Sequence, residues 1–259
     1  MNILVLPDMQ VKDGVPLEHL DWIGQFIVDK QPDVIVNIGD WADMPSLSSY
    51  DVGKKSFEGR RYLKDIEASK EAMGLLLGPM REYNKRRKKN KEKQYKPRLV
   101  LTLGNHENRI NRAIENDPKL EGVLSIKDLG YEKDGWEVVP FLEVVSIGGV
   151  CFSHYFTTGV MGRPVTSPNA LLTKKHRSCV MGHVQLDGVA SQYTADGKRL
   201  TGIFVGCGYL HDEEYLGAQG NRHARSVWML YDVNDGEFEH TQISLKYLDK
   251  KYGEGDYFQ

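Results

Sequence analysis

The stretch Asp33-Val34-Ile35-Val36-Asn37-Ile38-Gly39-Asp40 decides the fold class of this 259-residue chain. A short apolar run that ends in a Gly-Asp loop is typical of a buried strand. A similar run occupies Asn2–Pro7, and the segment between the two runs, Leu17–Lys30, carries its apolar residues at helical spacing. Strand, helix and strand within about 40 residues form a βαβ unit, so we expect two parallel strands here.

The rest of the chain changes from mixed α/β character to strand-rich character, with no obvious break. Asp196-Gly197 and Asp235-Gly236 are typical of hairpin turns between strands. We therefore expect a single domain over residues 1–259, with a basic helical insertion at about 58–97. Further strands are expected at Arg98–Leu103, Trp136–Val139, Leu142–Ile147, Val150–Ser153, Ser178–Met181, Val184–Tyr193, Leu200–Val205, Ser226–Val233 and Phe238–Ser244.

The composition excludes several classes of protein. With 40% hydrophobic and 27% charged residues, a chain of 259 residues buries enough surface to fold without disulfides. A mini-protein, a coiled coil, a collagen-like repeat and a disordered tail are thereby excluded. The net charge of −2 is unlike that of a domain that coats nucleic acid.

The cysteines and the N-terminus indicate where the protein works. Three cysteines without a Cys-X-X-Cys pair fit a reducing compartment, and we expect Cys151, Cys179 and Cys207 in the core. The sequence MNILVLPDMQ has no basic region before its apolar run, so it favours a strand over a signal peptide. No apolar stretch is long enough to span a membrane. We expect a cytoplasmic protein with no membrane contact.

One segment, Arg81–Lys93, is strongly basic, with eight Lys or Arg residues against two Glu. The simpler interpretation is the solvated end of a long helix. The alternative is a contact with an anion or a nucleic acid through Lys85–Lys93. Tyr83 is its only aromatic residue, which gives little support to base stacking.

Side chains of metal-ligand type follow five of the expected strands. Asp8 and Asp40 follow the first two strands, and Asn105 with His106 follows the third. His154 and His183 occupy equivalent places after two later strands. Ligands in open α/β sheets gather outside the carboxyl ends of the strands, so these side chains are expected to converge.

These blocks resemble those of the calcineurin-like metallophosphoesterases. Gly39-Asp40-Trp41-Ala42-Asp43, Gly104-Asn105-His106-Glu107 and Gly182-His183 match three of the family's blocks in order, over about two-thirds of the chain. The resemblance implies an α/β fold, a two-layer β-sandwich flanked by helices, with a metal centre of one or two divalent ions. It further implies hydrolysis of a phosphodiester or phosphomonoester by in-line attack of a metal-bound hydroxide.

The resemblance also assigns roles to single residues. Asp40 would bridge two metal ions, with Asn105, His154 and His183 completing one site and Asp8 belonging to the other. His106 would face the leaving group as a proton donor or stabiliser, and Asp43 would hold its other nitrogen. Glu107 is expected to shape its loop. Arg109 and Arg112 have either a phosphate-binding role or none beyond helix charge.

Two positions depart from the family pattern. The blocks Asp-X-His and Gly-His-X-His are here Asp8-Met9-Gln10 and Gly182-His183-Val184-Gln185. Both missing histidines belong to the same metal site in the family, which indicates a coordinated change. Gln10 and Gln185 are predicted to ligate through their amide oxygens, which favours Mn²⁺ or Mg²⁺ over Zn²⁺. A one-metal enzyme, or a first site that no longer binds metal, is the alternative.

Three functional interpretations stay open at this point. The first is a metal-dependent phosphoric ester hydrolase, and the second a DNA or RNA nuclease similar to the repair-exonuclease branch. The third is a non-catalytic binding subunit that keeps the fold. The loop segments His211–Glu214 and Asn221–Arg225 are further candidates for contacts with the substrate. Nothing in the sequence indicates the natural substrate or the oligomeric state.

Overall fold

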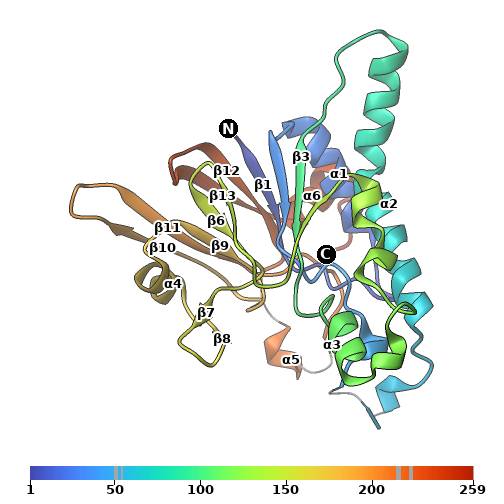
Figure 1. The fold of residues 1–259 in the computed structure, drawn as a ribbon. Coiled ribbons are helices and arrows are strands. Elements are labelled where there is room, and N and C mark those ends of the chain that lie inside the picture. Colours follow the sequence, from blue (N-terminus) through green and yellow to red (C-terminus); the bar gives the residue numbers. More distant parts are fainter. Residues whose placement is uncertain (50–51, 54, 214–216, 222–223, 259) are drawn as a thin grey trace.

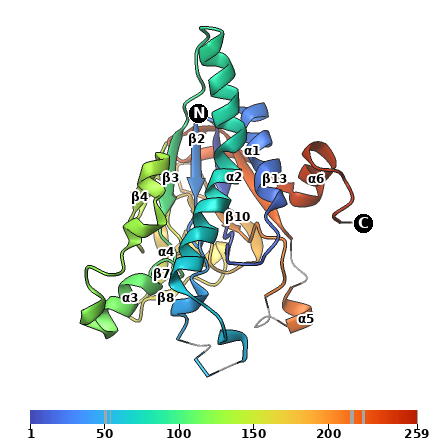
Figure 2. The same ribbon diagram turned by 90° about the vertical axis from the view of Figure 1, so that its right-hand side faces the viewer.

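Two β-sheets lie face to face, and helices cover the outer face of each (Figures 1 and 2). This arrangement comes from a computed structural model that describes residues 1–49, 52–53, 55–213, 217–221 and 224–258. The mixed α/β fold with two packed sheets and flanking helices is the fold class expected from the sequence.

The first sheet has the strand order β13-β12-β1-β2-β3-β4. Strands β1 to β4 are parallel, with Ile3 opposite Val34 in the first pair, which confirms the βαβ unit. The chain returns at its end to add β12 antiparallel to β1, and β13 antiparallel to β12. The strands are β1 (Ile3–Leu6), β2 (Val34–Asn37), β3 (Arg98–Thr102), β4 (Glu137–Val139), β12 (Ser226–Asn234) and β13 (Glu237–Ser244).

The second sheet has the order β10-β11-β9-β6-β5. Its central strands β6, β9 and β11 are parallel, and β5 and β10 are antiparallel edge strands. The strands are β5 (Val145–Ile147), β6 (Val150–Phe152), β9 (Cys179–Met181), β10 (Asp187–Tyr193) and β11 (Arg199–Val205), and β7 (Thr157–Thr158) pairs with β8 (Arg163–Pro164) in a separate hairpin.

Alternating side chains divide the core into layers. Ile3 and Val5 pack between the two sheets, against residues such as Val180. Leu4 and Leu6 point to the other face of the first sheet and pack against the helices. A strand that is buried on both faces has no polar alternation, which is why these strands are continuous apolar runs in the sequence.

The first sheet is covered by α1, α2 and α6, and the second by α4. Helices α1 and α2 approach closely, since a Cβ on Gly24 would lie 2.5 Å from the carbonyl oxygen of Leu76. The α-helices are α1 (Glu18–Lys30), α2 (Tyr62–Lys89), α3 (Arg109–Asn116), α4 (Pro168–Lys175), α5 (Gly217–Gly220) and α6 (Leu245–Tyr252), and the 3-10 helices are η1 (Pro45–Leu47), η2 (Lys55–Phe57), η3 (Pro118–Leu120), η4 (Ile126–Leu129) and η5 (Tyr131–Asp134).

Helix α2 continues past the end of the first sheet, and residues 90–97 return from its end to β3 (Figures 1 and 2). In the described part of the chain, no helix is both long enough and apolar enough to cross a membrane.

The expected strands are present, but two of them begin three residues later than the sequence indicated. The run predicted from Val184 becomes β10 only at Asp187, because His183 and Gln185 adopt left-handed φ values of 68° and 59°. The run predicted from Leu142 becomes β5 only at Val145, since Leu142 is also left-handed. The two delayed starts have the same cause, a backbone that is not extended.

Candidate metal centre

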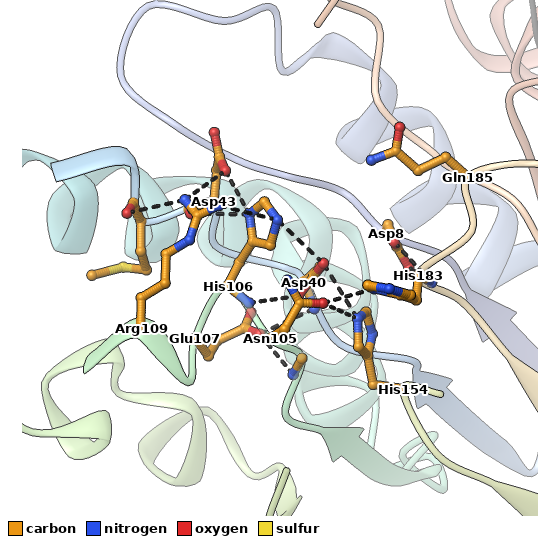
Figure 3. A network of polar contacts seen from close by, with 12 residues as sticks. Asp8, Asp40, Asp43, Asn105, His106, Glu107, Arg109, His154, His183 and Gln185 are labelled. Atoms are coloured by element: carbon orange, nitrogen blue, oxygen red, sulfur yellow. Dashed lines mark hydrogen bonds and ion pairs between the residues drawn. The ribbon is translucent and has the colours of Figure 1, made fainter. Parts of the chain in front are cut away.

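Loops at the ends of five strands bring the predicted site residues together (Figure 3). The loops after β1, β2 and β3 carry Asp8, Asp40 and Asn105, and those after β6 and β9 carry His154 and His183. Asp8, Asp40 and His154 are almost completely buried. Because the parallel strands of both sheets end on the same side of the molecule, residues far apart in sequence share one buried space.

Four side chains place ligand-type atoms around one point. The Oδ1 atom of Asn105 lies 2.9 Å from Nε2 of His154 and 2.8 Å from Nδ1 of His183. Nε2 of His154 is also 3.3 Å from Oδ2 of Asp40. Asp40, His154 and His183 each offer one ligand atom, and these atoms lie within 4.8 Å of one another. Two imidazoles with carboxylate and amide oxygens form a donor set that suits a divalent transition metal.

The tautomer of His154 is fixed from behind. Its Nδ1 donates to the carbonyl oxygen of Ile38 at 3.0 Å, which directs Nε2 toward Asp40 and Asn105. A hydrogen bond of this kind to the second ring nitrogen orients histidine ligands in metal proteins.

Two glycines allow the loops to approach this closely. A Cβ on Gly104 would lie 2.0 Å from Oδ1 of Asp40, and a Cβ on Gly182 would lie 2.2 Å from Oδ1 of Asp8. Any side chain at these positions would displace a carboxylate of the site. The Gly-Asn-His and Gly-His blocks of the sequence therefore have a steric reason for their glycines.

The two glutamines are placed differently. Oε1 of Gln10 is buried and has no hydrogen-bond partner in the described chain. Oε1 of Gln185 accepts a hydrogen bond of 2.9 Å from the Tyr209 hydroxyl. An unpartnered buried amide oxygen is costly, and a metal ion would satisfy it. The residues around Asp8 thus fit a cation, with Gln10 the better-supported of the two predicted amide ligands.

The electrostatics of the site favour a positive charge between its carboxylates. Burial raises the pKa of Asp8 to about 7, with the nearby Asp40 adding to the effect. Burial would lower the pKa of His154, but Asp40 and Asp8 outweigh it and raise that pKa to about 9. Burial would also raise the pKa of Asp40, but His106 and His154 outweigh it and lower that pKa, so Asp40 keeps its negative charge. Protonation of Asp8 and His154 offsets part of the buried negative charge, and a divalent cation would neutralise it more completely.

His106 stands beside the four-ligand cluster and is held by Asp43. Its Nδ1 lies 2.6 Å from Oδ1 of Asp43, and its Nε2 lies 3.6 Å from Oδ2 of Asp40. Burial alone would lower the pKa of His106, but Asp40 and Asp43 outweigh it and raise the pKa. Since Nδ1 donates its hydrogen bond to Asp43, the Nε2 atom is left facing the centre.

The structure separates the two candidate arginines. Nη1 of Arg109 donates to the carbonyl oxygen of Asp43 at 2.7 Å, and its Nη2 lies 3.3 Å from Nε2 of His106. Arg112 is exposed on α3 and is not among the residues that line the cleft. Arg109 is therefore a member of the site, and Arg112 has only the role of a helix surface charge.

Glu107 shapes its loop, as expected. Its carboxylate accepts hydrogen bonds from the backbone N–H groups of Asp40, Ala42 and Gly104, at 3.0, 2.9 and 2.8 Å. Tyr131 adds a hydroxyl contact at 3.3 Å. One buried carboxylate thereby joins the loop after β2 to the loop after β3.

Lys12 is a site residue that the sequence did not reveal. Its Nζ lies 3.1 Å from Oδ2 of Asp43 and 2.7 Å from Oε1 of Glu213, which also lies 2.7 Å from Nε2 of His211. Burial alone would lower the pKa of Lys12, but Asp43 and Glu213 raise it, so the ammonium charge is held firmly. No motif contains Lys12, and its position two residues after Gln10 was the only available signal.

The remaining loop candidates are only partly described. His211, Asp212 and Glu213 line the cleft, while Glu214, Arg222 and His223 lie outside the described residues. Arg225 contacts the carbonyl oxygen of Leu210 and the Asp212 carboxylate. Since it does not line the cleft, it does not support the predicted substrate contact.

The cleft over the metal centre has a volume of about 1300 Å³. That is more than a phosphate group requires, and it exceeds the roughly 300–1,000 Å³ that is typical of small-molecule pockets. Five cationic side chains line it, alongside the acidic residues of the centre: Lys12, Arg60, Arg61, Lys64 and Arg109.

No family model matches the chain, and no curated protein matches it in sequence. Among solved structures, the chain is similar to YfcE, a phosphoesterase from E. coli. The two are 13% identical, the match covers 95% of this chain and 100% of YfcE, and the TM-score is 0.40. What this chain does has to be inferred from its own side chains.

Proposed function

We propose that the chain is a metal-dependent phosphoric ester hydrolase. The observation that carries the proposal is the convergence of Asp40, Asn105, His154 and His183 on one point, directly beside the Asp43–His106 pair. A cluster of metal-ligand side chains alone would also be consistent with a metal site that only stabilises the fold. A buried imidazole oriented by a carboxylate and directed at the cluster adds a group that can transfer a proton.

The residues fit one or two divalent cations. Asp40, Asn105, His154 and His183 would hold the first, and Asp8 and Gln10 the second, with Asp40 available to both and Gln185 as a further ligand. When bound, such ions polarise a phosphoryl oxygen and lower the pKa of water to near neutrality. The oxygen donors of Asp8 and Gln10 favour Mn²⁺ or Mg²⁺ over Zn²⁺ at that position.

The chain's own residues supply the rest of the chemistry. His106 carries a proton on Nε2 toward the oxygen of the leaving group, and Asp43 keeps the ring in the orientation that permits this. Arg109 and Lys12 add positive charge at the same side of the cleft, where an anionic phosphoryl group is stabilised. A phosphodiester and a phosphomonoester both satisfy these requirements.

Hydrolysis of nitrophenyl phosphate esters tests the proposal. Activity on bis(p-nitrophenyl) phosphate or p-nitrophenyl phosphate should require Mn²⁺ or Mg²⁺ and should be abolished by Asp40→Asn. Asp232→Asn is a matched control, because Asp232 is exposed and has a φ of 51°, close to the 49° of Asp40.

Two outcomes would overturn the proposal. One is hydrolysis that continues unchanged in the Asp40→Asn variant. The other is no hydrolysis with any divalent metal although calorimetry shows that Mn²⁺ binds, which would favour a non-catalytic binding subunit.

A further inference from the structure

The end of α2 and the segment that returns to β3 form a basic projection, residues 81–97, which we call the α2 tip. It holds nine Lys or Arg residues and two Glu, a net charge of +7 in a chain whose total is −2. Figures 1 and 2 show it extending beyond the end of the first sheet.

Most of these cations have no partner within the described chain. Ion pairs connect Arg81 with Asp134, Arg87 with Glu92, and Lys85 with Glu82. Six others are exposed and make no ion pair with any described residue: Arg86, Lys88, Lys89, Lys91, Lys93 and Lys96. Unpaired like charges repel one another, so ion pairing within the described chain does not explain these six cations.

The helix dipole explains only part of the cluster. Cations are favourable in the last turn of a helix, which accounts for Arg86–Lys89. Lys91, Lys93 and Lys96 follow the end of α2, where that effect has faded. A further reason is needed for positive charge along the returning segment.

The returning segment is held in place. Asn84 donates to the carbonyl oxygen of Tyr95 at 2.7 Å and accepts from its backbone N–H at 2.8 Å. The Tyr95 hydroxyl donates to the carbonyl oxygen of Pro32 at 2.6 Å. A groove of about 930 Å³ lies here, with Lys88, Lys91, Lys93 and Lys96 among its lining residues. The cations are thus presented by an ordered surface.

We propose that the α2 tip binds the phosphate backbone of nucleic acid. A dense cluster of cations on a projecting ordered surface complements the dense negative charge of a nucleic-acid strand. A membrane surface is a poorer match, because interfacial helices insert large apolar side chains, and the described tip residues expose none. Tyr83 and Tyr95 hydrogen-bond through their hydroxyls to the body of the protein, so the contact is electrostatic and independent of base sequence.

The tip lies at the opposite end of the molecule from the metal centre. Strand β3 begins beside the tip at Arg98, and its other end leads to Asn105 and His106. Arg61 and Lys64, at the start of α2, line the cleft. Helix α2, with 28 residues, is about 42 Å long. Its two ends are therefore separated by about the length of 12 base pairs of duplex. Binding at the tip is therefore separate from hydrolysis and does not depend on the proposed function.

Binding of the full chain to a labelled DNA duplex of about 30 base pairs tests this, measured against salt concentration, with and without Mn²⁺. The test variant changes Lys88, Lys89, Lys91 and Lys93 to Gln. The control changes four exposed lysines elsewhere, Lys119, Lys127, Lys174 and Lys246, to Gln, and so removes the same charge. An RNA duplex of the same sequence, and vesicles rich in phosphatidylserine, are the other probes.

We expect the wild-type chain to bind the duplexes with a steep salt dependence. The test variant should bind at least about tenfold more weakly, with a salt slope smaller by up to about 3.6, while the control keeps both values. Equal weakening in the control, salt-independent binding, or binding to vesicles but not to either duplex would overturn the proposal. Hydrolysis of a small nitrophenyl ester should be the same in all three proteins, which separates this outcome from the test of the metal centre.

Discussion

The carboxylate of Glu107 accepts a hydrogen bond of 3.0 Å from the backbone N–H of Asp40. Asp40 is the central carboxylate of the candidate metal centre, and Glu107 is not among the residues that converge there. Because Glu107 also accepts from Ala42 and Gly104, it fixes the backbone of the two loops that carry Asp40 and Asn105. The position of the ligands thus depends on a buried acid that binds no metal itself.

Glu107→Gln should lower the free energy of unfolding by about 2–3 kcal/mol. The amide nitrogen of the new side chain would face backbone N–H groups that now donate to a carboxylate oxygen, which leaves at least one buried donor unpaired. Urea unfolding without metal measures the change. Glu137→Gln is the control, since Glu137 pairs with Arg98 on the surface and its loss should cost less than about 1 kcal/mol. Equal losses in the two variants would contradict a special role for Glu107.

His106→Asn and Asp43→Asn should slow hydrolysis in a way that depends on the leaving group. A proton donor matters most when the departing oxygen is strongly basic, so an alkyl ester should lose about 100-fold or more. A nitrophenyl ester, which leaves without a proton, should lose much less. Rates of paired alkyl and nitrophenyl esters give the comparison.

Asp13→Asn serves as the control for that series. Asp13 lines the same cleft but pairs with Lys64 at 3.0 Å and does not contact His106. Its loss should change both rates equally or not at all. If the His106 variant also slowed both esters by the same factor, His106 would not be the proton donor.

Gln10→Leu should separate metal binding from folding. Oε1 of Gln10 is buried and has no partner in the described chain, so its removal should not lower the free energy of unfolding without metal. The stabilisation that Mn²⁺ adds should fall, because a ligand is lost. Thermal unfolding with and without Mn²⁺ measures both effects.

Gln185→Leu is the contrasting variant. Its Oε1 accepts from Tyr209, so the substitution leaves a buried hydroxyl without that acceptor and should destabilise the protein even without metal. A Gln10→Leu protein that keeps its full response to Mn²⁺ would show that Gln10 is not a ligand.

His19 should make the protein less stable in acid. Burial, with smaller contributions from His211 and Arg225, lowers its pKa to about 3. An unfolded histidine has a pKa near 6.5, so between pH 6.5 and 3 only the unfolded state takes up the proton. Stability therefore falls as the pH decreases, by about 1.4 kcal/mol per pH unit from this residue.

His19→Leu should remove that part of the pH dependence. The difference in unfolding free energy between pH 7 and pH 5 should shrink by about 2 kcal/mol relative to wild type, as measured by urea unfolding. His176→Asn, at the left-handed end of α4, should keep the wild-type difference. Parallel pH profiles for wild type and His19→Leu would contradict the prediction.

Local patterns in the sequence were enough to predict most strands and to single out the side chains that converge after them. Runs such as Val34–Asn37 are mostly apolar because both faces of the strand are buried. This pattern can be recognised from the sequence of one strand, without knowledge of its neighbours. The blocks Gly104-Asn105 and Gly182-His183 were recognisable because a glycine stands directly before a side chain of metal-ligand type. Each glycine is required locally, since a Cβ there would collide with the carboxylate of Asp40 or Asp8.

Contacts between distant segments were decided only in the tertiary structure. The pairing of β12 with β1 and the Lys12–Glu213 ion pair join segments more than 200 residues apart, and no local pattern records which distant surface a side chain will meet. The same holds for Gln10 and Gln185, alike in sequence, of which only Gln185 has its amide oxygen taken by Tyr209. The sequence determined which chemical groups are available, because residue type is local. The tertiary structure decided which of them meet, because burial and pairing depend on the whole chain.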